Sequence, residues 1–368
     1  MTQPGGTRVN GRKQLAGRVS DYFLCLRSTV EFVYVGFFRK VTSCLETLTR
    51  DNGSMHMPFL KFRGCLFAFL LLALPVFAQA QINPPGISPA PAFPAFFDGI
   101  VVFHNVITGK GGMNDLHAEI AYPGNAAKPM PAIIFIHGGG WISGNDTQAP
   151  LRDIAKSGYF AASIEYRLSN VAKWPAQIQD CKLAVRWLRA NAAKYNVDPN
   201  RIGVWGSSAG GHLVACLGTM ADVKEYEGDG GYPGVSSAVQ AVVDFFGPTD
   251  FTHANIFSPP AIKLTEGLFG VPYEENPGLW KSGSPLFYVK AGDPPMLLVH
   301  GDSDGLVPLA QSTVFDEALT RAGVPHQFLV VKNGDHGFKP KPGTTIDPGD
   351  SEITKAVFAF FDKYLRAP

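Results

Sequence analysis

Charged residues are scarce in this chain, and the two signs almost balance. They make up 17% of the 368 residues, and the formal net charge is +1. Proteins that bind nucleic acids concentrate basic side chains on one surface, so this composition gives no electrostatic reason to expect a nucleic-acid partner. The sequence also has no internal repeat of fixed period. Its hydrophobic content of 45% is that of a globular protein with one large domain or two ordinary ones.

The chain lacks the two common phosphate-binding motifs. It has no GxxxxGKS/T segment, and no GxGxxG segment followed by an acidic partner. These absences argue against a P-loop or a dinucleotide-binding fold. They leave the glycine-rich stretch FIHGGGWISG, residues 135–144, in need of another explanation. Glycine has no Cβ, so another group can approach this backbone closely, and the oxyanion of a reacting ester is the remaining candidate.

Cysteine is also scarce. Only Cys181 and Cys216 follow residue 80, and each falls on the apolar face of a predicted helix. Two buried thiols and one disulfide both stay open, because an oxidising compartment permits a disulfide but the sequence does not show the geometry that it needs.

The strongest apolar run is too short to cross a bilayer comfortably. It covers residues 65–74, follows the basic residues Lys61 and Arg63, and precedes the small-residue sequence Ala-Gln-Ala at residues 78–80. A basic start, an apolar core and such a cleavage site are the three parts of a secretory signal peptide. No cysteine follows the cleavage site, which argues against a lipoprotein.

We therefore predict a signal peptide at residues 55–80, with a mature chain that begins at Gln81 and is periplasmic or secreted. Because signal peptides begin chains, we expect Met55 or Met57 to be the true start, and residues 1–54 to be upstream sequence from a wrong start assignment. A genuine cytoplasmic extension with a membrane anchor is the alternative. We expect no membrane association after cleavage, and the sequence does not indicate an oligomeric state.

The mature part begins with a proline-rich linker at residues 81–97 and continues as one catalytic domain at residues 98–368. In this domain eight short apolar runs alternate with segments at helical spacing. The pattern predicts an α/β fold, a mostly parallel eight-stranded sheet with helices on both faces. Residues 250–293 break the rhythm and are rich in proline, glycine and aromatics. We expect a small insertion there, at the carboxyl edge of the sheet.

A GxSxG motif lies between a predicted strand and a predicted helix, at residues 206–210. In that context the serine sits on a strained turn that presents its hydroxyl above the sheet, so Ser208 is the candidate nucleophile. Ser207 fits the glycine spacing less well, and an ordinary helix-capping serine is the alternative interpretation. A hydroxyl needs a base, and His336 follows the last predicted strand.

The histidine needs a carboxylate that fixes its tautomer. Asp304 is the predicted partner, since it follows the preceding strand and completes the order Ser, Asp, His of α/β-hydrolases. Asp302 and Asp335 are the alternatives. Asp302 can serve its own turn, and Asp335 is adjacent to the histidine in sequence.

Attack on an ester creates an oxyanion that needs backbone N–H donors. We assign this role to Gly139, Gly140 and Ala209, with the N–H of Trp141 as a possible substitute. The loop also places Trp141 beside the chemistry as a candidate substrate-binding residue. Four more aromatic residues are candidates either for lining a substrate pocket or for packing in the core: Phe246, Phe269, Trp280 and Phe338.

The combination of HGGGW, YRLS, GSSAGGHL and HGDSDGLVP resembles bacterial carboxylesterases of the α/β-hydrolase superfamily. It is most similar to the branch of bifunctional acetyl-xylan/feruloyl esterases, near the hormone-sensitive-lipase-like group, from about residue 97 to the end. That group continues YRLAPE, whereas this chain has YRLSN at residues 166–170. The resemblance implies that Ser208, Asp304 and His336 form a catalytic triad.

The resemblance also implies an exported serine esterase that needs no metal and no cofactor. Its expected substrate is a small-molecule or polysaccharide ester with a short acyl group, such as acetyl or feruloyl. We expect an open cleft, and kcat/KM that falls beyond about four to six acyl carbons. A kynurenine-formamidase-like amide hydrolase, which shares HGGxW and SAGGH, and a non-catalytic binding member of the fold are the alternatives.

Overall fold

The computed structural model describes residues 95–252 and 257–366. The chain divides into two compact units, Met1–Pro91 and Ala92–Pro368, and the described residues belong to the second. The predicted extension, the signal peptide and the linker up to residue 94 lie outside the described residues. Among the described residues, no helix has the length and apolar character that a membrane span requires.

One sheet of nine strands organises the second unit, in the order β1-β2-β3-β5-β4-β6-β7-β8-β9. The first three strands and the β3–β5 pair are antiparallel, and the other pairs are parallel. The strands are β1 (Ala95–Phe97), β2 (Ile100–Gly111), β3 (Asn114–Pro123), β4 (Met130–Ile136), β5 (Phe160–Ile164), β6 (Val197–Ser207), β7 (Ala241–Phe245), β8 (Met296–Gly301) and β9 (His326–Val331).

The predicted α/β architecture is therefore confirmed, but the sheet has one strand more than the eight expected. The extra strand is β1, whose three residues fall at the end of the predicted linker and pair with Ile100, Val101 and Val102. A three-residue strand is too short to show an alternating pattern, and the prolines before it led to the prediction of a linker. The inner strands β4, β5, β7 and β8 are buried at every position, as apolar strands covered on both faces are.

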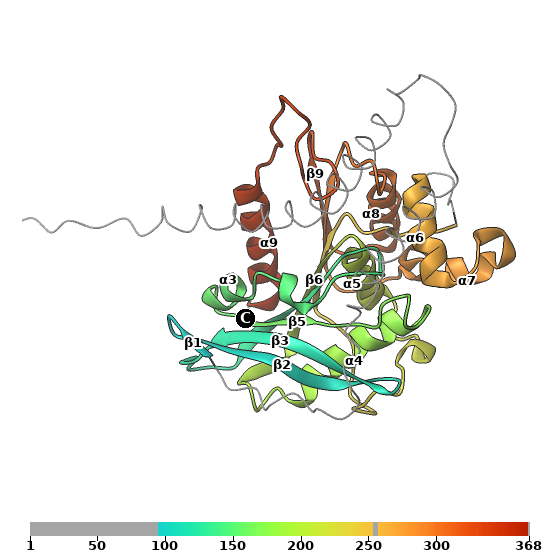
Figure 1. Cartoon of the computed structure of the whole chain (residues 1–368). Helices are drawn as coiled ribbons and strands as arrows, with labels where there is room; N and C mark the ends of the chain where they lie inside the picture. The colour runs from blue at the N-terminus through green and yellow to red at the C-terminus, as the bar shows by residue number, and fades with distance from the viewer. Residues whose placement is uncertain (1–94, 253–256, 367–368) are drawn as a thin grey trace, which may run out of the picture. The chain divides into compact units, whose positions relative to one another are not determined.

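Helices cover both faces of the sheet (Figure 1). Two of them, α3 and α9, pack on one face, and α4, α5 and α8 pack on the other. These helices are α3 (Leu151–Lys156), α4 (Ala176–Ala190), α5 (Ala209–Thr219), α8 (Ala310–Ala322) and α9 (Asp350–Leu365). Short 3-10 turns lie at η1 (Asp146–Gln148), η2 (Lys224–Tyr226), η4 (Tyr273–Glu275) and η5 (Pro285–Tyr288).

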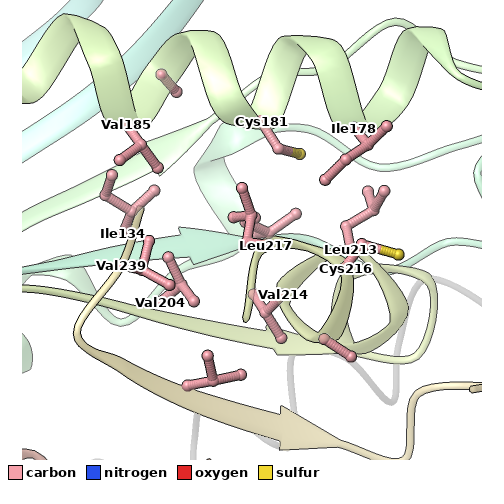
Figure 2. Packing of buried hydrophobic residues seen from close by; sticks show 14 of the residues in the cluster. Ile134, Ile178, Cys181, Val185, Val204, Leu213, Val214, Cys216, Leu217 and Val239 are labelled. Atoms are coloured by element: carbon pink, nitrogen blue, oxygen red, sulfur yellow. The ribbon is translucent and has the colours of Figure 1, made fainter. Parts of the chain in front are cut away.

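The core between α4 and α5 contains both cysteines of the described part of the chain (Figure 2). Apolar side chains of the two helices and of the strands beneath surround them, among them Val185, Leu213 and Ile134. Both thiols are free and fully buried, and burial raises the pKa of each well above its ordinary value. Of the two interpretations left open by the sequence, the structure has the pair of buried thiols.

The predicted insertion contains two helices, α6 (Pro259–Phe269) and α7 (Pro277–Ser282), between β7 and β8. Its aromatic residues join the main hydrophobic core, in which the buried rings of Phe269 and Trp280 stack with centroids 5.1 Å apart. Helix α6 reaches the sheet's carboxyl edge, since Leu264 lies against Gly140. The strands β4, β6, β8 and β9 end at this edge, and the loops that follow them carry the candidate site residues.

Candidate active site

Ser208 occupies the sharp turn between β6 and α5. Its backbone has φ 56° and ψ −119°, a positive φ that is uncommon outside glycine. Two hydrogen bonds hold the turn, from Ser208 N to Phe245 O at 2.8 Å and from His212 N to Ser208 O at 2.9 Å. The strained backbone is thus fixed by its neighbours on both sides, as functional turns require.

The two glycines of the GxSxG motif are required by packing. A Cβ on Gly206 would lie 2.3 Å from the Gly210 carbonyl oxygen, and a Cβ on Gly210 would lie 2.1 Å from the Ile136 carbonyl oxygen. No side chain fits at either position. The motif therefore has glycine at the two positions where the turn comes close to its own backbone and to the backbone of β4.

His336 joins the two other candidate residues. Its Nε2 lies 2.9 Å from the Ser208 hydroxyl oxygen, and its Nδ1 lies 2.7 Å from Asp304 Oδ2. The predicted contact between Asp304 and His336 is present, and the three residues form one hydrogen-bonded chain. They come from three different loops of the carboxyl edge.

The two alternative aspartates have structural partners instead. Asp302 Oδ1 accepts a hydrogen bond from Asn333 N at 2.8 Å. Asp335 Oδ1 accepts from Gly305 N at 3.0 Å and from His336 N at 2.8 Å. Both carboxylates therefore join the loop after β8 to the loop after β9, and they position Asp304 and His336 relative to each other.

The environment of Asp304 favours its charged form. The side chain is fully buried, which disfavours the charge, but hydrogen bonds with His300 and His336 outweigh burial and hold the Asp304 pKa well below its ordinary value. Its Oδ1 also accepts from Leu306 N and Val307 N, both at 2.9 Å. A carboxylate fixed in this way can orient an imidazole and stabilise its cation.

His300 has a supporting role that its sequence context did not indicate. This residue is fully buried at the end of β8, where its Nε2 lies 3.4 Å from Asp304 Oδ2 and 2.8 Å from Val307 O. Ser312 of α8 lies 2.7 Å from its Nδ1. The signal was its position four residues before Asp304, but a lone histidine in an apolar run does not show which side it faces.

The glycine-rich loop after β4 lies beside Ser208. Gly139 and Gly140 have φ of 103° and 60°, and Trp141 follows with φ 60°. The loop is closed by hydrogen bonds from Ile142 N and Ser143 N to Gly139 O. A Cβ on Gly138 would lie 2.8 Å from the Ser207 carbonyl oxygen, so only glycine lets this loop approach the serine turn. Backbone N–H groups in this place are suited to an oxyanion.

One predicted aromatic residue contacts the candidate base, and a second packs behind it. The Phe246 ring meets the His336 ring edge-on with centroids 4.7 Å apart, and Phe338 packs against Phe246 at 4.9 Å. Both phenylalanines are buried. Phe246 holds the imidazole from the side, whereas Phe269 and Trp280 pack in the main hydrophobic core. Of the five aromatics considered, Trp141 is the one in the pocket beside Ser208.

A family model described as BD-FAE matches residues 118–319, more than half of the chain. The chain belongs to the BD-FAE family. The match spans the glycine-rich loop, Ser208 and Asp304, and it ends before His336. The fold is that of the α/β-hydrolase carboxylesterases, as the sequence motifs predicted.

Known proteins with similar sequences or structures are named as esterases. Esterase LipQ of Mycobacterium tuberculosis is 37% identical over 240 residues, which are 62% of this chain and 56% of LipQ. A truncated carbohydrate esterase from gut microbiota is 34% identical with a TM-score of 0.64, over 75% of this chain and 99% of that one. The propionate-bound Est2 of Thermogutta terrifontis is 27% identical with a TM-score of 0.58, over 77% and 97%. The chain spans about half the length of the curated relatives it matches.

In this BD-FAE chain the YRLS segment supports the glycine-rich loop from behind. Tyr166 stacks on the His137 ring at 4.3 Å and donates its hydroxyl to His137 O at 3.1 Å. Ser169 N donates to Trp141 O at 2.7 Å. The Arg167 guanidinium forms a two-pronged pair with the buried Asp180 carboxylate, which fixes the segment to α4. The segment therefore supports the glycine-rich loop even though its sequence departs from YRLAPE.

A second histidine anchors Trp141, a role that its sequence context did not indicate. His212 of α5 is fully buried; its Nδ1 accepts from the Trp141 indole N–H at 3.3 Å, and its Nε2 lies 2.7 Å from Gly283 O. Burial lowers its pKa to about 4, so the ring is neutral at neutral pH and has an acceptor for the indole. His212 thus joins the loop of this BD-FAE chain to the insertion.

Proposed function

We propose that this protein hydrolyses carboxylic esters through a covalent acyl-enzyme on Ser208. The observation that carries the proposal is the hydrogen-bonded chain from Ser208 through His336 to Asp304. The esterase names of the similar proteins support the same reaction class. An amide hydrolase with the same machinery is the alternative that the substrate panel described below distinguishes.

In the proposed reaction, Ser208 Oγ attacks the ester carbonyl carbon while His336 Nε2 takes the hydroxyl proton. The N–H groups of Gly139, Gly140 and Ala209 stabilise the oxyanion. When the intermediate collapses, the bond to the alcohol oxygen breaks and His336 returns the proton to that oxygen. Water then attacks the acyl-enzyme by the same sequence and releases the acid. Asp304 stays ionised throughout and stabilises the imidazolium.

The substrate class that we propose is a short-acyl ester, with acetyl or feruloyl groups on plant polysaccharide as the natural form. A carbohydrate esterase among the similar structures supports a sugar as the alcohol, and the propionate bound to a more distant neighbour supports a short acyl group. A panel of p-nitrophenyl esters, acetylated xylan, methyl ferulate and N-formylkynurenine tests this class. Fast cleavage of N-formylkynurenine with negligible ester turnover would assign an amidase instead.

The decisive experiment replaces the proposed nucleophile. Ser208→Ala should lower kcat/KM for p-nitrophenyl acetate by on the order of a millionfold, as removal of a catalytic serine does. Ser207→Ala is the matched control and should keep most of the activity. Circular dichroism should show the same fold in both variants. Substantial and equal activity in the two variants would refute the assignment.

We also propose that the protein is exported and processed before Gln81. The support is the signal pattern at residues 55–80, with its basic start, apolar core and cleavage site. N-terminal sequencing of the exported protein should begin at Gln81. Recovery of a mature protein that still contains residues 1–54 would overturn both the export and the start assignment.

A further inference from the structure

Asp146 is a buried acid that follows the glycine-rich loop. Its neighbours Asn145 and Thr147 are exposed, whereas Asp146 is 5% exposed. The Asn145 side chain accepts hydrogen bonds from the backbone N–H and the hydroxyl of Thr147, at 3.1 and 2.6 Å, which fix the 3-10 turn η1. In the part of the chain that the structure describes, Asp146 Oδ2 has no hydrogen-bond partner. The turn therefore holds a carboxyl group inward without satisfying it.

The sheet beneath η1 contributes two more carboxyl groups. The turn packs against β3 and β5. Glu119 of β3 stands opposite Ser163 of β5 in the strand register, and Glu165 directly after β5 donates its N–H to His117 O at 2.9 Å. Alternate residues of a strand point to the same face of a sheet, so these four side chains share one face. Asp146 lies close enough to feel the charges of both glutamates.

Hydrogen bonds hold the two glutamates in place. Glu119 Oε1 accepts from Asn105 N at 3.0 Å, and its Oε2 contacts His104 Nδ1. Glu165 Oε2 lies 3.3 Å from His117 Nδ1. At neutral pH, each glutamate is thus a negative charge at a fixed position near η1.

These surroundings favour the uncharged form of Asp146. Burial is the largest effect, and repulsion by Glu165 and Glu119 adds to it. The backbone N–H of Asp146 and the nearby His104 act in the opposite direction, and the pKa of Asp146 is raised to about 7. Above that pH, the turn would bury an unpaired charge beside two others, which is costly. Ionisation therefore favours movement of Asp146 out toward water.

The chain between Asp146 and the oxyanion donors has no slack. A Cβ on Gly144 would lie 2.3 Å from His137 Nδ1, and a Cβ on Gly139 would lie 2.2 Å from Ser143 O. The hydroxyl and the N–H of Ser143 both donate to Gly139 O, at 3.0 and 3.1 Å. The loop is therefore folded tightly on itself, and an outward movement of Asp146 displaces Gly139.

We propose that Asp146 is a positioning residue for the oxyanion donors: as a neutral acid it holds the glycine-rich loop against the sheet, and its ionisation releases the loop and sets an upper pH limit on catalysis. The inference rests on the proposed esterase function. The change is the loss of one proton to solvent. Because oxyanion donors act in the transition state, the loss should appear in kcat rather than in KM, and one misplaced donor lowers kcat about 10²–10³-fold.

The test compares wild type and Asp146→Asn on p-nitrophenyl acetate between pH 6 and pH 9. In wild type, kcat should decline as the pH rises through about 7, while KM changes little. The variant cannot ionise at this position, so its kcat should not decline in this range. The variant-to-wild-type ratio of kcat, in which shared titrations cancel, should rise at least about tenfold. A ratio that is the same at all pH values would overturn the inference.

Glu165→Gln tests the same coupling without changing Asp146. The Glu165 side chain is 40% exposed, so this variant carries the test even where Asp146→Asn folds poorly. Removal of the neighbouring negative charge lets Asp146 ionise more readily, and the decline of kcat should move to lower pH. Glu317→Gln, which changes an exposed carboxylate of α8, is the matched control and should leave the pH profile unchanged. An unshifted profile in Glu165→Gln would contradict the inference.

A measurement without substrate tests the ionisation itself. The folded state holds the Asp146 proton more tightly than the unfolded state, so its contribution to stability is fully present below about pH 4 and is lost as the pH rises through about 7. In urea unfolding, Asp146→Asn should therefore gain stability relative to wild type between pH 4 and pH 8. A stability difference that is independent of pH would refute the inference.

The wild-type profile separates this inference from the proposed function. Wild type that hydrolyses p-nitrophenyl acetate with no decline of kcat up to pH 9 refutes the role of Asp146 and leaves the esterase function intact. Wild type that hydrolyses no ester refutes the esterase function and this inference with it.

Discussion

Asp304 and Asp244 are two buried aspartates near the carboxyl ends of the neighbouring strands β8 and β7. Asp304 follows β8, and its carboxylate has hydrogen-bond partners at both oxygens. Asp244 lies within β7 and is 1% exposed. Its Oδ1 accepts from Gly247 N at 2.9 Å, and within the described residues its Oδ2 has no hydrogen-bond partner.

The pKa shifts in opposite directions at these two buried positions. At Asp244, burial exceeds the effects of the Gly247 hydrogen bond and of nearby His300, and it raises the pKa to about 6. At Asp304, the hydrogen bonds with two histidines exceed the same penalty and lower the pKa. Partners rather than depth therefore decide which carboxyl group is a dependable anion. Asp304 can support an imidazolium, whereas Asp244 holds the turn after β7.

The largest expected difference between the two aspartates is in catalysis. Asp304→Asn should lower kcat/KM for p-nitrophenyl acetate by about 10⁴-fold, because an amide cannot stabilise the imidazolium and favours the wrong tautomer of His336. Asp244→Asn keeps the oxygen that accepts from Gly247 N, and its activity should stay within about tenfold of wild type. Steady-state kinetics at neutral pH checks both. Equal losses in the two variants would mean that the carboxylates do not differ in role.

The next difference is in the pH dependence of stability. The folded-state pKa of Asp244, about 6, lies above its ordinary value of 3.8, so the folded state binds the proton more tightly than the unfolded state. Its contribution to the free energy of unfolding is thus fully present below about pH 4 and is lost as the pH rises to about 6. The loss is of the order of 2–3 kcal/mol.

Asp244→Asn removes this titration. Urea unfolding at pH 4 and pH 7 should show that the variant gains stability relative to wild type as the pH rises, by up to about 2–3 kcal/mol. Asp302→Asn, an exposed change at the same edge of the sheet, is the control and should show no such trend. A stability difference between Asp244→Asn and wild type that is the same at both pH values would contradict the raised pKa.

The smallest effects are expected for the aspartates that join the loops around Asp304. Asp302→Asn and Asp335→Asn each retain an oxygen that can accept the backbone hydrogen bonds seen in the structure. Weakening one such bond is worth about 1 kcal/mol, so each variant should lose no more than about tenfold in kcat/KM. Kinetic assays of these two variants, run in parallel with Asp304→Asn, check this order of effects on kcat/KM. A loss at Asp335 as large as that at Asp304 would reopen the choice of the third residue.

The sequence predicted the parts of the site that depend on the spacing of motif residues along the chain. The GxSxG motif located Ser208 because packing excludes any side chain from its glycines. Asp304 was preferred because Asp302 can serve its own turn and Asp335 adjoins the histidine in sequence, and the Asp304–His336 contact is present. These features depend on backbone geometry, which leaves a signature in the local sequence.

The parts that it did not predict depend on tertiary contacts. His300 and His212 each occur alone in apolar segments, and only the packed structure shows that they contact Asp304 and Trp141. The aromatics of the insertion were candidates for the pocket, yet Phe269 and Trp280 anchor α6 while Leu264 faces Ser208. Which face of a helix turns toward a site depends on the residues that anchor its other face.

The hydrogen bond between Ser208 and His336 joins positions 128 residues apart in the sequence. Because β9 pairs with β8 at the edge of the sheet, the imidazole reaches the serine only after the last parallel strand has docked. Recovery of turnover during refolding should therefore coincide with the slowest long-range pairing rather than with early helix formation. Enzymatic activity therefore reports the completion of folding.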